Sequence, residues 1–159
     1  MKGKAIILMG SERDLDFCRK ITKYLDLLGV DYEFRIASAH KTPKKVLNII
    51  ENFEKEKIVY ITVAGRSNAL SAFVDANTSN PVIACPPISE KFGGADIFSS
   101  LRVPSGIGSV ITIEPEGAAI AAAKILALED KTILKFVKTH QLSKKKILVE
   151  ANEKIKNLK

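Results

Sequence analysis

Cysteine and aromatic residues are scarce in this chain of 159 residues, and tryptophan is absent. The two cysteines, Cys18 and Cys85, stand far apart and form no CxxC pair. Zinc sites and redox motifs usually need such closely spaced pairs, so both kinds of site are disfavoured. We interpret the two cysteines as small buried hydrophobic residues.

Long hydrophobic runs are also missing. No apolar stretch approaches the roughly 20 residues that a helix needs to cross a bilayer. At the amino terminus, Met1–Lys4 leads into the short apolar run Ala5–Met9, and no small-residue cleavage site follows. We therefore expect a cytoplasmic protein with no secretory leader and no membrane partner.

The remaining composition is that of a globular protein, since 46% of the residues are hydrophobic and 27% are charged. We expect a single domain over residues 1–159. The net charge of +7 raises the question of a nucleic-acid partner. We favour a solvated helix face instead, and a modest positive field also suits a phosphorylated small substrate. Much of the excess charge follows a helical pattern with few aromatic residues, at Lys135, Lys138, Lys144, Lys145, Lys146, Lys154, Lys156 and Lys159.

Segments with the patterns of strands and helices alternate along the chain. Such alternation is typical of an α/β fold, in which helices cover both faces of a parallel sheet. Five strands favour a three-layer α/β/α, flavodoxin-like sheet of order 2-1-3-4-5, followed by a long carboxyl-terminal helix. Strands are predicted over Lys4–Met9, Asp31–Ala37, Ile58–Ala64, Val82–Cys85 and Val110–Glu114, and helices over Arg13–Leu28, Pro43–Glu56, Asn68–Thr78, Gly117–Leu128 and Lys131–Leu158.

Three segments in the second half of the chain raise further expectations. Ser89–Ser109 is loop-rich, with one helical turn predicted near Asp96–Leu101. The helix over Gly117–Leu128 is rich in alanine, so we expect it to pack closely against the sheet or another subunit. The last helix follows no strand, and we expect that it can pack on a neighbouring subunit.

Polar residues gather where the second predicted strand ends. Ser38, His40 and Lys41 precede a helix for which Thr42 is the predicted N-cap and Pro43 the first residue. Open α/β sheets bind ligands at strand carboxyl ends, and helix amino termini attract anions. Ser38 and Lys41 can donate to a phosphate, while His40 can move protons near neutral pH. We favour this interpretation over a capping turn with an incidental histidine.

A similar turn follows the first predicted strand. Gly10 permits a tight bend, Ser11 can cap a helix or donate a hydrogen bond, and Asp14 can accept hydrogen bonds from sugar hydroxyls. An ordinary capped helix start, with Ser11 as the cap, explains the same residues equally well.

The third turn begins at Ala64. Gly65 lets a ligand approach the backbone closely, and the amides with the side chains of Ser67 and Asn68 can polarise a small carboxyl-like group. A turn that is merely capped by Ser67 or Asn68 is equally consistent with these residues. Because parallel strands end at the same edge of a sheet, we expect the three turns to converge on one crevice.

Several familiar sites are absent from the sequence. It has no metal-ligand cluster, no P-loop, no GxGxxG motif after a strand, and no nucleophile elbow. The three turns therefore predict a site for a phosphorylated substrate and one proton transfer, with no cofactor and no metal.

Five motifs, taken in order, carry a resemblance to a known family. They are Met9–Asp14, Ser38–Pro43, Ala64–Ser71, Pro81–Pro87 and Ser99–Gly106. Over about residues 4–130 the chain resembles the aminoimidazole ribonucleotide (AIR) carboxylases of de novo purine synthesis. The resemblance implies a flavodoxin-like fold and a homo-oligomer, usually an octamer, with a tetramer as the alternative. Arg13 departs from the first motif, which usually has a second serine there.

The resemblance also implies roles for individual residues. Ser11, Ser38 and Lys41 would hold the 5′-phosphate of the substrate, and Asp14 the ribose. His40 would be the catalytic residue that moves the C4 proton. The loop Asp96–Gly106 would cover the site, from the same or a neighbouring subunit. The third turn would frame the base and the carbon dioxide pocket, through Ala64, Gly65, Arg66, Ser67, Asn68 and Leu70.

The family has two classes. Class I, the N5-carboxyaminoimidazole ribonucleotide mutase, moves a carboxylate already on its substrate, whereas class II takes carbon dioxide directly. Class I typically has arginine after the turn histidine and His-Leu-Pro in the glycine turn, where this chain has Lys41 and Ala69-Leu70-Ser71. The chain resembles class II, the type found in animals and some bacteria, with the class I mutase as the main alternative.

A non-catalytic flavodoxin-like module is the alternative from a different functional class. An electron carrier would need aromatic residues around a flavin, and this chain has no tryptophan and only three tyrosines. A signalling receiver would need an aspartate at the end of the third strand, where this chain has Ala64-Gly65. Both alternatives fit the residues less well than a carboxylase.

Overall fold

The computed structural model describes residues 3–156 and residue 158, and a parallel five-stranded sheet forms its centre. The strand order β2-β1-β3-β4-β5 confirms the predicted order. The central strands β1 and β3 are almost wholly buried, as expected for near-continuous apolar strands covered on both faces. The strands are β1 (Lys4–Met9), β2 (Asp31–Ile36), β3 (Ile58–Val63), β4 (Val82–Ala84) and β5 (Val110–Ile111).

Helices follow the strands as predicted, although most are shorter than expected. The first begins later than predicted, because the chain forms a 3-10 turn, η1 (Glu12–Asp14), before α1 begins. The loop-rich segment contains two more 3-10 turns, η2 (Glu90–Phe92) and η3 (Ala95–Ile97). The α-helices are α1 (Leu15–Leu27), α2 (Pro43–Phe53), α3 (Ala69–Asp75), α4 (Phe98–Leu101), α5 (Pro115–Leu126) and α6 (Lys131–Lys156).

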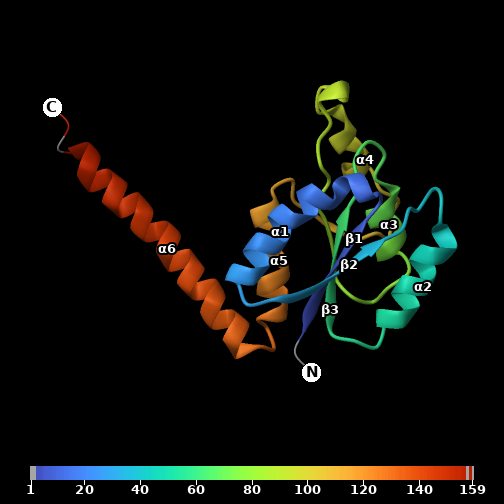
Figure 1. Cartoon of the computed structure of the whole chain (residues 1–159), viewed down its shortest axis with the longest axis horizontal. Coiled ribbons are helices and arrows are strands. Elements are labelled where there is room, and N and C mark those ends of the chain that lie inside the picture. The colour runs from blue at the N-terminus through green and yellow to red at the C-terminus, as the bar shows by residue number, and fades with distance from the viewer. Residues whose placement is uncertain (1–2, 157, 159) are drawn as a thin grey trace.

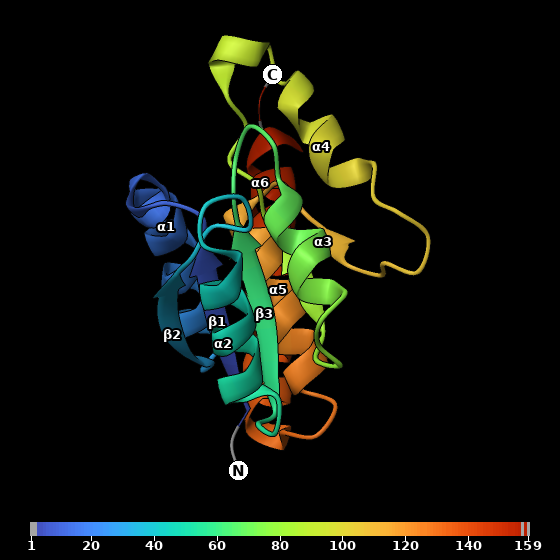
Figure 2. The ribbon, with the colours of Figure 1, turned by 90° about the vertical axis from the view of Figure 1, so that its right-hand side faces the viewer.

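Two apolar clusters lie on opposite faces of the sheet. One packs α2 and α3 against it, and the other packs α1 and α5. Figure 2 shows this layering, with α2 and α3 in front of β3 and α5 behind it. Cys18 and Cys85 are fully buried in the α1/α5 cluster as free thiols, which confirms their predicted place in the core.

The alanine-rich helix α5 packs within this chain. Ala118, Ala119, Ala122 and Ala123 are fully buried, and α5 lies against α1, β3 and β4. Small side chains let these backbones approach closely, so the predicted close packing is realised against the sheet and α1.

Helix α6 is anchored to the body by residues between its start and its middle. Ile133 and Val137 are buried, and the Glu116 carboxylate of α5 accepts hydrogen bonds from Lys144 Nζ (2.7 Å) and His140 Nε2 (3.1 Å). These contacts, that of Lys144 first, lower the pKa of Glu116. Beyond this anchor α6 runs away from the sheet (Figure 1).

The lysines predicted to form a solvated helix face are exposed in α6, apart from Lys159, which lies outside the described residues. Large apolar side chains of α6 are exposed too, and no helix in the described part of the chain is long and apolar enough to cross a membrane.

Candidate active site

The sheet aligns the three candidate turns at one edge. Met9, at the end of β1, is in register with Ile36 of β2 on one side and Val63 of β3 on the other. The turns therefore leave three adjacent strands at the same level, within about 10 Å of one another at the usual strand spacing. Because α1 covers one face of the sheet and α2 the other, β1 and β3 flank the topological switch point where such sheets bind ligands.

The turn after β1 lies directly against the turn after β3. Gly10 donates its N–H to Val63 O (2.9 Å), and a β-carbon on Gly10 would stand 3.4 Å from the Ala64 side chain. Ser11 accepts from Arg13 N–H (3.2 Å), so it caps the η1 turn. Asp14 is half-buried beside Gly10, and burial raises the pKa of its carboxyl, partly offset by the backbone of Ser11. Arg13 is exposed.

The turn after β2 is held by hydrogen bonds between its own residues. Ser38 N–H donates to Thr42 Oγ1 (2.9 Å), Lys41 N–H to Ser38 Oγ (3.2 Å), and Thr42 N–H to Ser38 O (2.8 Å). Thr42 takes the predicted N-cap position and Pro43 the first position of α2, but the Thr42 hydroxyl closes this turn instead of capping the helix amides.

His40 and Lys41 are presented to solvent by this turn. Both residues are exposed, and neither side chain has a hydrogen bond or ion pair with the part of the chain that the structure describes. The Ser38 hydroxyl, which accepts from Lys41, keeps its own proton free to donate. The turn thus offers an imidazole, an ammonium and a hydroxyl to a ligand at the sheet edge.

The turn after β3 is held by a distant part of the chain. Arg66 N–H donates to Asp96 Oδ2 (3.3 Å), and Asn68 N–H donates to Ser99 Oγ (2.9 Å). The Asn68 side chain is buried, where its amide donates to Ser100 Oγ (3.0 Å) and its oxygen caps α3 by accepting from Ser71 N–H (3.2 Å).

Two of the residues predicted to frame the substrate therefore lie inside the protein. The side chain of Asn68 is occupied by the cap and by Ser100, and Leu70 is packed in the α2/α3 cluster. Arg66 and Ser67 are exposed at the turn, and Gly65 meets the chain after β4, since a β-carbon there would stand 3.0 Å from Pro87 O. The structure thus brings the three turns together but gives their residues different surroundings.

Asp96, Ser99 and Ser100 are site residues that sequence reasoning did not identify individually. The loop Asp96–Gly106 is predicted to cover the site, and in the structure its first part forms hydrogen bonds with the turn after β3 of the same chain. The contacts join residues 30 to 32 positions apart, so no local pattern reveals them. Within the described residues, no group of three or more histidine, cysteine or acidic side chains is arranged to hold a metal ion.

A sequence model described as AIR carboxylase matches residues 4–146 of the chain. A phosphoribosylaminoimidazole carboxylase of Archaeoglobus fulgidus is 56% identical over 153 residues, which cover 96% of this chain and 85% of that protein. The bifunctional phosphoribosylaminoimidazole carboxylase/phosphoribosylaminoimidazole succinocarboxamide synthetase of Rattus norvegicus is 41% identical over 155 residues, or 96% of this chain and 36% of that protein.

The fold is likewise that of a solved relative. The crystal structure of Treponema denticola PurE superimposes with a TM-score of 0.94 at 45% sequence identity, covering 98% of this chain and 99% of that one.

Proposed function

Because the chain belongs to the AIR carboxylase family, we propose that it joins carbon dioxide directly to 5-aminoimidazole ribonucleotide, as a class II enzyme does. The product is 4-carboxy-5-aminoimidazole ribonucleotide, formed without ATP, a cofactor or a metal. We further propose that residues 1–159 act as one catalytic domain in the cytoplasm.

The observation that carries this proposal is the alignment of the three turns. Register places Gly10, Ala37 and Ala64 side by side at the start of the turns, and the middle of the second turn presents His40 and Lys41 to solvent. A phosphorylated nucleotide can span such an edge, with its phosphate at one turn and its base at another.

For substrate binding, we assign the phosphate to Ser11, Ser38 and Lys41, which are donors on two neighbouring turns. Asp14 would accept hydrogen bonds from the ribose hydroxyls. The turn Ala64–Leu70 would frame the base and the carbon dioxide, with Gly65, Arg66 and Ser67 nearest the ligand. Asn68 and Leu70, whose side chains are buried, would act by shaping this turn.

The chemistry we propose needs one proton transfer. The aminoimidazole ring is an enamine, so its C4 carbon is nucleophilic and forms a bond to carbon dioxide. The resulting intermediate still carries the C4 proton and has lost ring aromaticity. His40 takes this proton, the ring regains its aromaticity, and in the reverse direction protonated His40 returns the proton. The enzyme contributes position and exclusion of water.

Two features favour direct carboxylation over carboxylate migration. Lys41 and the Ala69-Leu70-Ser71 sequence follow the class II pattern, and the chain has substantial identity to an animal protein named for its carboxylase activity. The class I mutase is the second candidate, since both classes share the remaining motifs.

We also propose that the enzyme is a homo-oligomer, an octamer with a tetramer as the alternative. Two surfaces of a single chain expose large apolar side chains, which contacts with further copies would cover. One is the far part of α6, with Leu142, Ile147, Leu148, Val149 and Ile155, and the other surrounds η2 and α4, with Ile88, Phe92, Phe98 and Leu101. Light scattering should give eight times the 17.4 kDa of one chain, and a monomer would contradict the proposal.

One assay separates the candidate activities. The purified enzyme is incubated with 5-aminoimidazole ribonucleotide and bicarbonate, without ATP and without any partner synthetase. We expect carboxylation at a rate that follows the dissolved carbon dioxide concentration. Activity with the N5-carboxylated substrate alone would assign the chain to class I, and inactivity with both substrates would reject a role as a carboxylase or mutase.

A further inference from the structure

One carboxylate oxygen of Asp96 joins the turn after β3 to Ser89–Asp96, the segment that projects from the sheet edge (the projecting segment). Asp96 Oδ2 accepts from Arg66 N–H (3.3 Å) and from Ser89 N–H (3.0 Å). The other oxygen, Oδ1, is buried and has no partner among the described residues. Asp96 thus serves two backbone amides that lie on separate parts of the chain.

The amide of Arg66 belongs to a residue in an unfavourable conformation. Among the described residues, Arg66 is the one non-glycine residue with a positive φ, 62°. In this region the β-carbon crowds the backbone, so an ordinary side chain stays there only when its surroundings hold it. The hydrogen bond to Asp96 holds Arg66 on its amide side. The Ser99 hydroxyl lies 3.2 Å from Arg66 O and can donate to it on the other side.

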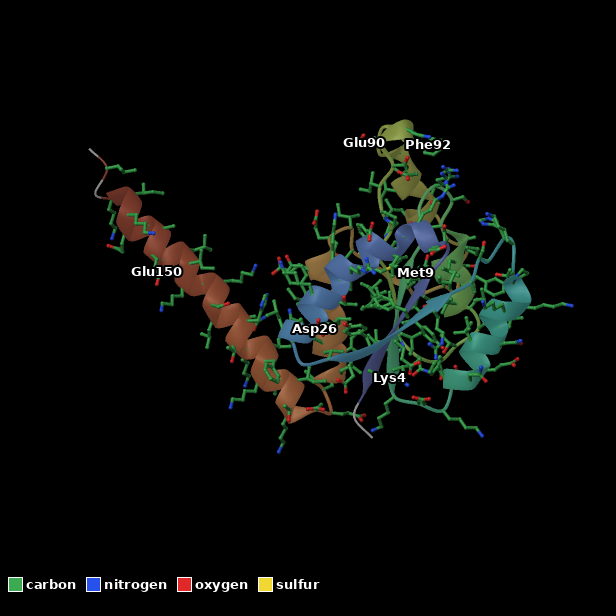
Figure 3. The ribbon with its side chains drawn as sticks, in the orientation of Figure 1. Lys4, Met9, Asp26, Glu90, Phe92 and Glu150 are labelled. Carbon is green, nitrogen blue, oxygen red and sulfur yellow. The ribbon has the colours of Figure 1, made fainter. Side chains whose placement is uncertain are left out.

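Asp96 is itself fixed by the base of the projecting segment. Gly93 and Gly94, both with positive φ, return the chain after η2, so that Ser89 and Asp96 meet. Figure 3 shows Glu90 and Phe92 at the tip of this segment, well away from the sheet. The carboxylate therefore stands between the base of the projecting segment and the turn at the sheet edge.

From these contacts we propose that Asp96 is a positioning residue of the active site. Its carboxylate keeps Arg66 in the left-handed conformation and thereby fixes the path of Gly65–Ser67 around the base and carbon dioxide. This inference rests on the proposed function of that turn. Asp96 touches no reacting atom in this proposal and acts through the backbone of Arg66.

A double-mutant cycle between positions 96 and 66 tests the proposal, because glycine adopts a positive φ without strain. Asp96→Ala should lower kcat/KM for carboxylation by about 10- to 100-fold, the cost of a misplaced site. Arg66→Gly sets a new baseline of activity. In that background, Asp96→Ala should lower kcat/KM by a much smaller factor. Equal fold losses in both backgrounds would overturn the proposal.

Two further variants provide controls. Asp96→Asn keeps an acceptor oxygen in place and should retain most of the activity that Asp96→Ala loses. Asp75→Ala removes a carboxylate that accepts from Gly108 N–H (2.7 Å) in a different loop, and it should show no coupling to position 66. If Asp96→Ala does not fold, Asp96→Ser runs the same cycle, since its hydroxyl is too short to replace the carboxylate.

A readout without substrate separates this proposal from the proposed function. In Asp96→Ala, hydrogen exchange at the Arg66 amide should become faster, whereas exchange in β1 and β3 should stay as slow as before. Unchanged exchange at Arg66 would overturn the positioning role. If the parent enzyme does not carboxylate the ribonucleotide, the function fails, yet the exchange result still decides whether Asp96 holds the turn.

Discussion

The turns Ser38–Pro43 and Ala64–Leu70 lie at the same edge of the sheet, but they are built in opposite ways. The first is closed by hydrogen bonds between Ser38, Lys41 and Thr42, and its His40 and Lys41 side chains are exposed. The second depends on Asp96, Ser99 and Ser100, about thirty residues further along the chain. Substitution of the exposed His40 or Lys41 in the first turn should therefore affect activity and leave stability unchanged, whereas loss of the buried Asn68 side chain in the second turn should lower stability.

The largest expected effect tests the first turn. His40→Asn should lower kcat by about 10²–10⁴-fold, the range for lost acid–base catalysis, while the substrate still binds. Because His40 is exposed and makes no hydrogen bond with the described residues, the melting temperature should not move. Single-turnover kinetics, calorimetric titration and thermal unfolding measure the three quantities. A variant that keeps most of its turnover would remove His40 from the mechanism.

A smaller effect is expected at the neighbouring lysine. Lys41→Ala should raise KM by about 10- to 100-fold with little change in kcat, since a charged hydrogen bond to phosphate contributes about 1.5–3 kcal/mol to substrate binding. Lys41→Arg, which keeps the charge, is the matched control, and its KM should lie between those of the parent and Lys41→Ala. Steady-state kinetics at fixed ionic strength give both constants, and an unchanged KM would argue against the phosphate contact.

The second turn should respond through stability. Asn68→Ala leaves the Ser71 amide and the Ser100 hydroxyl without their partner in the interior, so we expect a loss of about 1–3 kcal/mol in the free energy of unfolding. Urea denaturation measures this loss, and Ser67→Ala, at the exposed neighbouring position, should leave the unfolding free energy nearly unchanged. If Asn68→Ala were as stable as Ser67→Ala, the buried contacts of Asn68 would not be what stabilises the second turn.

The smallest effect concerns pH and the half-buried Asp14. Burial raises the pKa of its carboxyl, so the folded chain holds this proton at a pH where the unfolded chain has released it. Its contribution to stability therefore falls as pH rises from the ordinary aspartate range through the raised value. Asp14→Asn should unfold at a higher temperature than the parent at neutral pH, and this gain should vanish in acid.

The same variant should bind substrate less well, because the ribose loses an ionised acceptor. A melting-temperature difference independent of pH would contradict the stability argument, and an unchanged KM would contradict the ribose contact. Asp14→Asn therefore tests whether the carboxylate in the turn after β1 lowers stability and at the same time strengthens substrate binding.

Local sequence signals predicted the parts of the molecule that are built locally. Apolar runs predicted the five strands, and the flavodoxin-like fold that five alternating strands suggest supplied their order. The residues after each strand identified the turns that the register aligns. The contacts of Asp96, Ser99 and Ser100 could not be predicted from local sequence, since they join segments that become neighbours only after folding. The buried position of Asn68 depends on the same contacts, so its sequence context could not distinguish a ligand contact from a cap.

Both cysteines lie in one apolar cluster, and burial raises the pKa of each thiol to about 12. At neutral pH almost no thiolate exists, so a thiol reagent can react only when α1 or α5 separates from the sheet. The native chain thus carries an intrinsic probe of its own opening. A single cysteine introduced on the exposed part of α6 would be the one rapidly labelled position. Labelling of that cysteine would then report on assembly, while labelling of Cys18 and Cys85 would report on unfolding in the same sample.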